Sequence, residues 1–160
     1  MQSAIIYYSY SGNTRRVAQA LGGILQARGP VDMIELEGLD ESKSFFLQAA
    51  RAFRRKRALI NPVNFDLSRY DFICVGTPVW AFGPAPAVNT YMDRVAGLEG
   101  KDILIFTTYG SGAGKERCAD YMREILSKKG AKSFKKVSVQ QFKAGDKDFV
   151  ASAIKSALAP

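Results

Sequence analysis

A cluster of hydroxyl, glycine and amide residues, Ser9–Thr14, follows the first apolar segment of the chain and precedes an amphipathic helical pattern. Backbone N–H groups at the start of a helix have no intrahelical partner and carry partial positive charge, so they attract phosphate groups. The serine and threonine hydroxyls can add donors, and Gly12 lets the backbone turn closely around an anion. The cluster predicts a phosphate site, and a simple helix cap with a turn is the alternative interpretation.

Two further loops follow later strand-like segments. The first, residues 77–86, holds the only tryptophan, Trp80, and the second, residues 107–114, is rich in glycine. A planar ring bound against Trp80 or Tyr109 would explain an aromatic side chain at a strand end, and packing of Trp80 and Phe82 over the end of the sheet is the alternative. The glycine-rich segment lacks the spacing of a nucleoside-triphosphate loop or a dinucleotide fingerprint. We therefore interpret it as a turn that lets the backbone approach a flat ring.

Strand-like and helical segments alternate along the whole chain. Strands are predicted at Ser3–Ser9, Val31–Leu36, Asp71–Gly76, Asp102–Thr107 and Ser133–Val139. Five apolar stripes at helical spacing comprise Val17, Leu21, Ile24 and Leu25; Phe45, Ala49, Ala52 and Phe53; Val88, Tyr91, Met92 and Val95; Cys118, Tyr121, Met122, Ile125 and Leu126; and Phe149, Val150, Ala153, Ile154, Ala157 and Leu158. The alternation predicts an α/β fold, a doubly wound five-stranded parallel sheet with helices on both faces.

The polarity of the strands predicts their order. The first, third and fourth strands are nearly continuous apolar runs, as expected for central strands covered on both faces, whereas the second and fifth contain charged residues that suit an edge. The order 2-1-3-4-5 satisfies both conditions. Its topological switch point lies between the first and third strands, where ligands bind at the carboxyl ends. All three loops should meet there.

Composition limits the classes of function. The chain has 160 residues, 47% of them hydrophobic, which fits one domain over residues 1–160. It has no histidine, so imidazole catalysis and histidine metal sites are excluded, and any reaction should be carried by a bound group. Cys74 and Cys118 lie on apolar patterns and are predicted to be buried thiols. Neither a leader pattern nor a membrane-spanning run is evident, so we expect a cytoplasmic protein.

The three loops together resemble the cofactor loops of the flavodoxin family, of the short-chain type. The resemblance extends over essentially the whole chain, including the order of strands and helices. It implies flavin mononucleotide (FMN) as cofactor, with the first loop on its phosphate and the other two against the isoalloxazine ring. The positions implied to bind FMN are Ser9, Tyr10, Ser11, Gly12, Asn13, Thr14, Thr77, Pro78, Val79, Trp80, Ala81, Phe82, Gly83, Thr107, Thr108, Tyr109, Gly110, Ser111 and Gly112.

The charge of the chain departs from this family pattern. Familiar flavodoxins are acidic, whereas this chain has 23 Lys and Arg against 15 Asp and Glu, a net charge of +8. A basic cluster comprises Arg51, Arg54, Arg55, Lys56 and Arg57. It is either a solvated helix end or a docking patch for an acidic redox partner or the 2′-phosphate of NADPH. No aromatic interleaving or nucleic-acid motif accompanies the charge, so nucleic acid is not an expected partner.

The resemblance implies an electron carrier that shuttles electrons between redox partners. The alternative is an NAD(P)H-dependent quinone or nitro-compound reductase on the same fold. A response-regulator-like signalling domain shares the strand order but requires acidic residues after the first strand, where this chain has Ser9 and Tyr10. We also expect the backbone of 80–83 to accept a hydrogen bond from the central-ring nitrogen of reduced flavin, with Gly83 allowing the peptide to rotate.

Overall fold

The computed structural model describes residues 1–39 and 57–159, and all structural statements refer to these ranges. The strands are β1 (Ser3–Tyr8), β2 (Val31–Leu36), β3 (Phe72–Trp80), β4 (Gly83–Pro84), β5 (Asp102–Tyr109) and β6 (Ser133–Gln140). The helices are α1 (Asn13–Gln26), α3 (Pro86–Arg94), α4 (Lys115–Lys128) and α5 (Lys147–Leu158), with a 3₁₀ turn, η1 (Gln141–Lys143), after β6.

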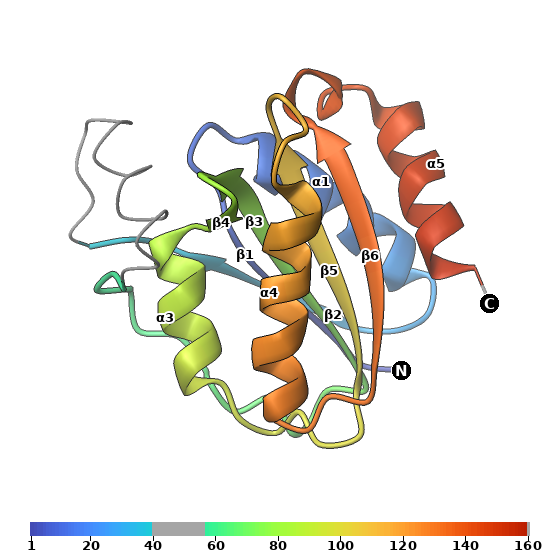
Figure 1. Cartoon of the computed structure of the whole chain (residues 1–160). Helices are drawn as coiled ribbons and strands as arrows, with labels where there is room; N and C mark the ends of the chain where they lie inside the picture. The colour runs from blue at the N-terminus through green and yellow to red at the C-terminus, as the bar shows by residue number, and fades with distance from the viewer. Residues whose placement is uncertain (40–56, 160) are drawn as a thin grey trace.

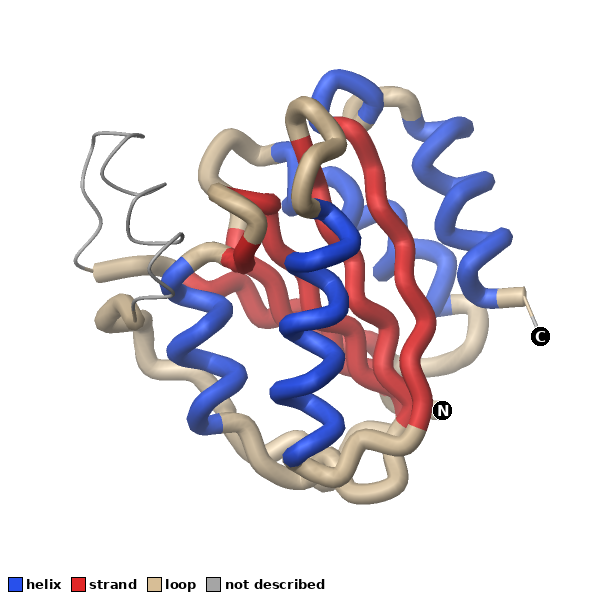
Figure 2. The backbone as a smooth tube through the Cα atoms, viewed as in Figure 1, coloured by secondary structure: helices blue, strands red, loops and turns tan. Residues whose placement is uncertain are grey.

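The sheet has the predicted topology. Five parallel strands pair in the order β2-β1-β3-β5-β6, which confirms the predicted order once the short β4 is left out of the count (Figures 1 and 2). β4 was not predicted. It pairs antiparallel with the end of β3, with Val79 opposite Pro84 and Trp80 opposite Gly83, and so forms a hairpin at the carboxyl edge of the sheet.

Three strands extend beyond their predicted ends. β3 continues from Gly76 to Trp80, and β5 continues from Thr107 to Tyr109, so the first residues of both predicted loops belong to strands. β6 likewise includes Gln140. The β3 and β5 extensions remain paired with each other at Thr77 and Thr107 and at Pro78 and Thr108. Paired strands therefore carry the first polar residues of these segments, where the sequence predicted loops.

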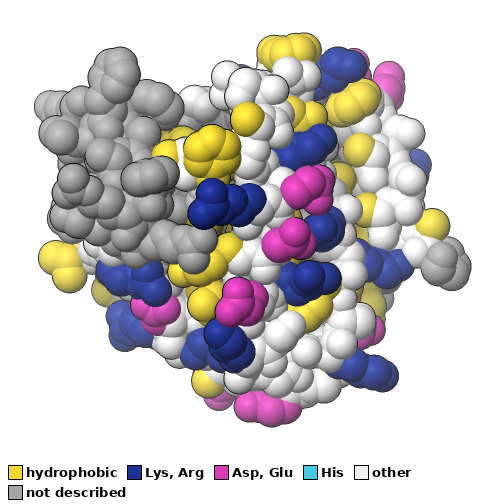
Figure 3. Space-filling model, in the orientation of Figure 1, with side chains coloured by type: hydrophobic (Ala, Val, Ile, Leu, Met, Phe, Trp, Pro, Cys, Tyr) yellow, Lys and Arg dark blue, Asp and Glu magenta, His cyan; other side chains and the backbone are white. Residues whose placement is uncertain are grey.

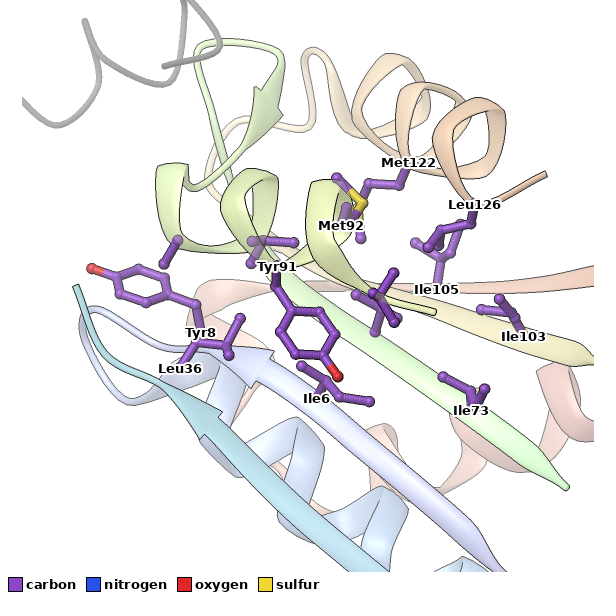
Figure 4. Packing of buried hydrophobic residues seen from close by; sticks show 14 of the residues in the cluster. Ile6, Tyr8, Leu36, Ile73, Tyr91, Met92, Ile103, Ile105, Met122 and Leu126 are labelled. Atoms are coloured by element: carbon purple, nitrogen blue, oxygen red, sulfur yellow. The ribbon is translucent and has the colours of Figure 1, made fainter. Parts of the chain in front are cut away.

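Helices cover both faces of the sheet, and each face has its own core. Alternate β1 side chains point to opposite sides: Ile6 and Tyr8 pack with residues of α3 and α4, whereas Ile5 and Tyr7 pack with residues of α1 and α5. Figure 4 shows the first core, where Met92 of α3 meets Met122 of α4 over the sheet. Since β1 is buried on both sides, its residues read as an unbroken apolar run.

The predicted helical stripes correspond to buried helix faces in the described residues. The stripe starting at Val17 lies in α1, the stripe starting at Val88 lies in α3, and the last two lie in α4 and α5. Phe149 is an exception because it is exposed. The stripe at Phe45, Ala49, Ala52 and Phe53 lies outside the described residues. Cys74 and Cys118 are buried thiols that form no disulfide, as predicted.

The surface over α3 and α4 has basic and acidic side chains interspersed (Figure 3). On α4, Lys128 pairs with Glu124, and Glu116 and Asp120 both pair with Lys136 of β6. No described helix combines the length and the apolar character needed to cross a membrane. Within residues 1–39 and 57–159, no group of three or more His, Cys, Asp or Glu side chains is arranged to hold a metal ion.

Candidate functional site

A pocket of about 510 Å³ lies at the carboxyl ends of the central strands, beside the switch point between β1 and β3. Its volume is in the range of roughly 300–1,000 Å³ that is typical of small-molecule sites. The three predicted loops meet there. The pocket is lined by Tyr10, Ser11, Asn13, Thr14, Pro78, Val79, Trp80, Ala81, Phe82, Thr108, Tyr109, Gly110, Ser111, Ala113 and Gln141.

The first loop satisfies one of the free backbone N–H groups at the start of α1. Gly12, the residue before the helix, has a φ of 85°, in the left-handed region that glycine adopts most easily, and it has no side chain that could cap the helix. Ser9 accepts a hydrogen bond of 3.1 Å from the Arg15 backbone N–H. The Asn13 amide donates to the Ser11 hydroxyl at 3.1 Å. The side chains thus shape the loop, and the helix start remains available for an anion.

A buried hydrogen bond joins the first and third loops. The Thr14 and Thr108 hydroxyl oxygens lie 2.8 Å apart, and both residues line the pocket. Thr77 and Thr107 have structural roles in the same layer. Thr77 accepts a hydrogen bond from the Ala85 N–H at 2.9 Å, and Thr107 shares one with the Ser138 hydroxyl. The first contact thus joins the first loop to the third, the second holds the end of β3 to the start of α3, and the third joins β5 to β6.

The second loop is a tight hairpin turn with unusual backbone angles. Ala81 and Phe82 have φ values of 46° and 68°, the left-handed region that residues with a Cβ rarely adopt. Two-residue hairpin turns commonly need positive φ at both central positions, which normally selects glycine or asparagine. Gly83 instead lies in β4 and is buried. The special backbone positions are therefore Ala81 and Phe82, whereas the sequence pointed to Gly83.

Gly114 allows the turn to pack against the start of α4. A Cβ at this position would lie 2.3 Å from Cδ1 of Phe82 and 2.9 Å from its Cα. Gly114 also has a φ of 84° and caps α4. A glycine is therefore required there for two independent reasons.

The aromatic side chains of the loops have different environments. Trp80 is only 6% exposed and meets Tyr8 and Tyr10 edge-to-face, at ring centroid distances of 5.7 and 5.4 Å. Trp80 therefore packs over the end of the sheet, as the alternative interpretation held, while still lining the pocket. Phe82 and Tyr10 are 42% and 43% exposed at the pocket. They are the apolar surfaces that a planar ligand can cover.

Six of the predicted binding residues do not line the pocket: Ser9, Gly12, Thr77, Gly83, Thr107 and Gly112. Each supports a neighbour that does, through the backbone or a hydrogen bond. Two lining residues were missed. Ala113 continues the third loop, and Gln141 begins η1 after β6. Gln141 could have been found from its position directly after the fifth predicted strand, because all parallel strands end at the same edge of the sheet.

Charged groups surround the pocket, but none of the lining residues carries a charge. Arg15, in the first turn of α1, forms a bidentate ion pair with Glu35 at 2.7–3.0 Å, and Glu35 also accepts a hydrogen bond from Tyr7. Burial, then the Glu35 carboxylate, raises the pKa of Tyr7 to about 12. At the third loop, the Lys115 ammonium lies 4.8 Å from the Tyr109 ring centroid, and the Arg117 guanidinium lies 6.0 Å from that of Phe82.

The donor set of the pocket fits a flavin phosphate ester. Hydroxyl groups of Ser11, Thr14 and Ser111, the Asn13 amide and the backbone N–H groups at the start of α1 are neutral donors, and aromatic side chains line the same pocket. The fold and the pocket thus define an FMN-binding protein of the flavodoxin-like class.

The chain belongs to the NADPH-dependent FMN reductase family, whose model matches residues 1–144. The family confirms the predicted cofactor, FMN, and the predicted flavodoxin-like character of the chain. No curated protein matches the chain.

Solved structures share the fold at low sequence identity. A flavoprotein from Lactobacillus acidophilus in complex with FMN is 20% identical, with a TM-score of 0.71, covering 91% of this chain and 97% of its own. Flavodoxin 2 from Bacillus cereus is 20% identical with a TM-score of 0.64, covering 98% and 97%. An NADH:FMN oxidoreductase in its apo form is 18% identical with a TM-score of 0.63, covering 98% and 88%.

Only part of the predicted docking cluster lies in the described residues. Arg51, Arg54, Arg55 and Lys56 lie outside them. The Arg57 guanidinium pairs with the Asp93 carboxylate of α3, with Nη2 2.8 Å from Oδ1. Arg57 is therefore engaged within the molecule, which favours a structural role for this one member of the cluster.

Proposed function

We propose that this chain is an NAD(P)H-dependent FMN oxidoreductase that reduces a small acceptor such as a quinone or nitro compound. The observation that carries the proposal is the family match over residues 1–144. The open aromatic surfaces beside the pocket and the cations at the third loop support it further. We therefore favour a reductase over the electron carrier that the sequence resemblance implied.

The phosphate of FMN would lie at the start of α1. Backbone N–H groups there, with the hydroxyls of Ser11 and Thr14, can donate to its oxygens, and the helix dipole favours the negative charge. The Arg15 cation is nearby but already paired with Glu35. Binding would thus depend on neutral donors, and it should be less sensitive to salt than binding by free cations.

The flavin ring would lie between the 81–82 turn and the third loop. Trp80 and its buried neighbour Tyr8 would support the turn, and Tyr109 and Gly110 would bound the other side. FMN, when bound, supplies the hydride and electron chemistry. The role of the chain is to position the ring and keep part of it open to a second substrate. The proposed hydrogen bond from flavin to the backbone of 80–83 would involve the turn at Ala81 and Phe82.

The phosphate groups of a nicotinamide dinucleotide would lie near Lys115 and Arg117. Both side chains lie against aromatic rings at the pocket, Tyr109 and Phe82 respectively. Neither forms an ion pair with a described residue. Two cations that lie beside the flavin site without a carboxylate partner suit a polyanionic electron donor.

An electron-carrier function is the second candidate, favoured by one observation. Phe142 is 72% exposed in η1, directly after Gln141, which lines the pocket. An exposed aromatic side chain beside a cofactor suits transient contact with a partner protein. A carrier would exchange electrons with such a partner and would not turn over NADPH by itself.

One experiment separates the two functions. The purified protein is loaded with FMN and mixed with NADPH and a soluble quinone, and NADPH consumption is followed at substoichiometric enzyme. We expect many turnovers per FMN. Retention of FMN with no turnover of either NADPH or NADH, across several quinone and nitro acceptors, would exclude the reductase and leave the carrier.

A further inference from the structure

A second cavity, of about 540 Å³, lies between α1 and α5 on the face of the sheet opposite α3 and α4. It is separate from the FMN pocket and shares no lining residue with it. The proposed reaction does not use it. The residues that line it are Arg16, Gln19, Ala20, Gly23, Ile24, Ala144, Gly145, Lys147, Val150 and Ala151.

The cavity has a cationic end and an apolar end. Both helices begin at the carboxyl edge of the sheet, so Arg16 in the first turn of α1 and Lys147 at the start of α5 lie toward that edge. Further along the helices, Gly23 and Ile24 line one wall, and Val150 and Ala151 line the other. A ligand that fits must therefore have an anionic head and an apolar body.

Gly23 lines the apolar end of the cavity and has no side chain that could fill it. A glycine inside a helix makes the helix less stable than alanine does. The preceding residue, Gly22, has a packing reason, because a Cβ there would lie 3.3 Å from the sulfur of Met33. A Cβ at Gly23 would meet no atom within 4 Å, and the same is true at Gly145. Gly23 is exposed, so a longer side chain at this position would project into open space and occupy part of the cavity.

No carboxylate among residues 1–39 and 57–159 forms an ion pair with either cation. Arg16 donates a hydrogen bond of 3.0 Å to the side-chain carbonyl of Asn13, a neutral group. Neither Arg16 nor Lys147 forms an ion pair with a residue in the described ranges. Asp146 lies beside Lys147, but its carboxylate accepts the capping hydrogen bond from the Phe149 N–H at 3.0 Å. Asp148 follows in the first turn of α5 and does not line the cavity.

We propose that the α1–α5 cavity binds a small organic acid, with its carboxylate between Arg16 and Lys147 and its apolar body against Gly23 and Ile24. A guanidinium and an ammonium group together favour a carboxylate through charge-assisted hydrogen bonds. The apolar walls favour a hydrocarbon chain or ring over a polar one. The site would bind its ligand independently of the redox reaction.

The test uses the ¹⁵N-labelled, FMN-saturated protein titrated with octanoate, and amide shifts are recorded. Saturation with FMN keeps the first pocket filled, and flavin absorbance reports its occupancy in the same sample. We expect saturable shifts in residues 16–24 and 144–151. 1-Octanol, which has the same chain without the charge, should bind about tenfold more weakly, which corresponds to about 1.4 kcal/mol.

Two pairs of variants test the two ends of the cavity. Gly23→Leu fills the apolar end and should weaken octanoate binding about tenfold. Gln26→Leu places the same side chain on α1 outside the cavity and should have no effect. Lys147→Gln should weaken binding of octanoate but not of octanol, whereas Lys155→Gln on the exposed part of α5 should change neither. Ala151→Leu repeats the filling test from the other wall, in case Gly23→Leu fails to fold.

The absence of saturable shifts at these amides would overturn the proposal, and so would equal affinity for octanoate and octanol. Equal weakening by Gly23→Leu and Gln26→Leu would also overturn it. Failure of the proposed reductase activity would appear as absent NADPH turnover, which this titration does not measure. The two results are therefore independent.

Discussion

The hydroxyl groups of Thr14 and Thr108 share a buried hydrogen bond of 2.8 Å across 94 positions of sequence. Thr14 belongs to the first turn of α1, and Thr108 belongs to the end of β5. This contact fixes the phosphate loop relative to the ring-binding loops, because both residues line the same pocket. The spacing between the two ends of the FMN site thus depends on one pair of neutral side chains.

Replacement of Thr14 by valine should weaken both folding and FMN binding. It leaves the buried Thr108 hydroxyl without its partner, and an unsatisfied buried polar group lowers stability by about 1–3 kcal/mol. The double variant Thr14→Val/Thr108→Val should be less destabilised than the sum of the single variants, as measured by urea unfolding without FMN. Additive effects in this cycle would show that the hydrogen bond contributes nothing.

Ala81→Gly should stabilise the protein. Ala81 has a φ of 46°, and positive φ in a residue with a Cβ is unfavourable by about 1–3 kcal/mol. After the entropy of the added glycine is subtracted, we expect a gain of about 1 kcal/mol in the free energy of unfolding. Ala27→Gly, at a φ of −64°, is the matched control and should be destabilising. A loss of stability in both variants would contradict strain at Ala81.

Gly114→Ala should displace the 81–82 turn. Its Cβ would overlap the Phe82 ring and backbone, so FMN affinity should fall about tenfold in a fluorescence-quenching titration. Gly100→Ala is the control, because Gly100 has a φ of 72° but no atom lies within 4 Å of the added Cβ. Both variants share the backbone strain, and only Gly114→Ala introduces the collision. Unchanged FMN affinity in Gly114→Ala would show that the 81–82 turn does not contribute to FMN binding.

The double variant Lys115→Gln/Arg117→Gln should raise KM for NADPH about tenfold and leave kcat unchanged, because the two cations are proposed to contact the donor and not the flavin. The difference from the unmodified protein should shrink at high salt. Lys128→Gln, at the other end of α4 in an ion pair with Glu124, serves as the control. An altered kcat with constant KM would assign these cations to another step.

Glu35→Gln should lower the pKa of Tyr7, which burial and the Glu35 carboxylate raise to about 12. Below pH 10 the tyrosine is protonated in both states. Between pH 10 and 12 only the unfolded chain loses the proton, so stability decreases over this window as pH rises. The variant should lower the upper limit of this pH range but keep it above pH 10, because burial raises the pKa of Tyr7 more than the Glu35 carboxylate does. Absorbance titration of tyrosinate measures the shift, with Glu116→Gln, which removes a carboxylate paired with Lys136, as the control.

The fold could be predicted from sequence because its signals are local and periodic. Unbroken apolar runs in β1, β3 and β5 identified the central strands, and charged residues in β2 and β6 identified the edges. The strand ends were less accurate. Pairing between β3 and β5 continues through Thr77 and Thr107, where the local composition suggests a loop.

The site was predicted at the level of loops and not of individual contacts. Hydroxyl and glycine residues after β1 and β5 marked the right segments, because parallel strands end at one edge of the sheet. Gln141 was missed because glutamine after an edge strand has no distinctive pattern. For Trp80, ligand contact and packing over the sheet end were both open from sequence, and the structure shows it nearly buried against Tyr8 and Tyr10 while lining the pocket.

The amino-acid sequence by itself determined the order of the strands through the polarity of its apolar runs, and the resemblance of its three loop motifs to the flavodoxin family implied FMN as the cofactor. Only the tertiary structure decided which side chains reach the pocket. It also decided that Ala81 and Phe82 adopt the left-handed turn and that α1 and α5 enclose a second cavity. These properties depend on contacts between residues far apart in the chain, and local sequence carries little information about such contacts.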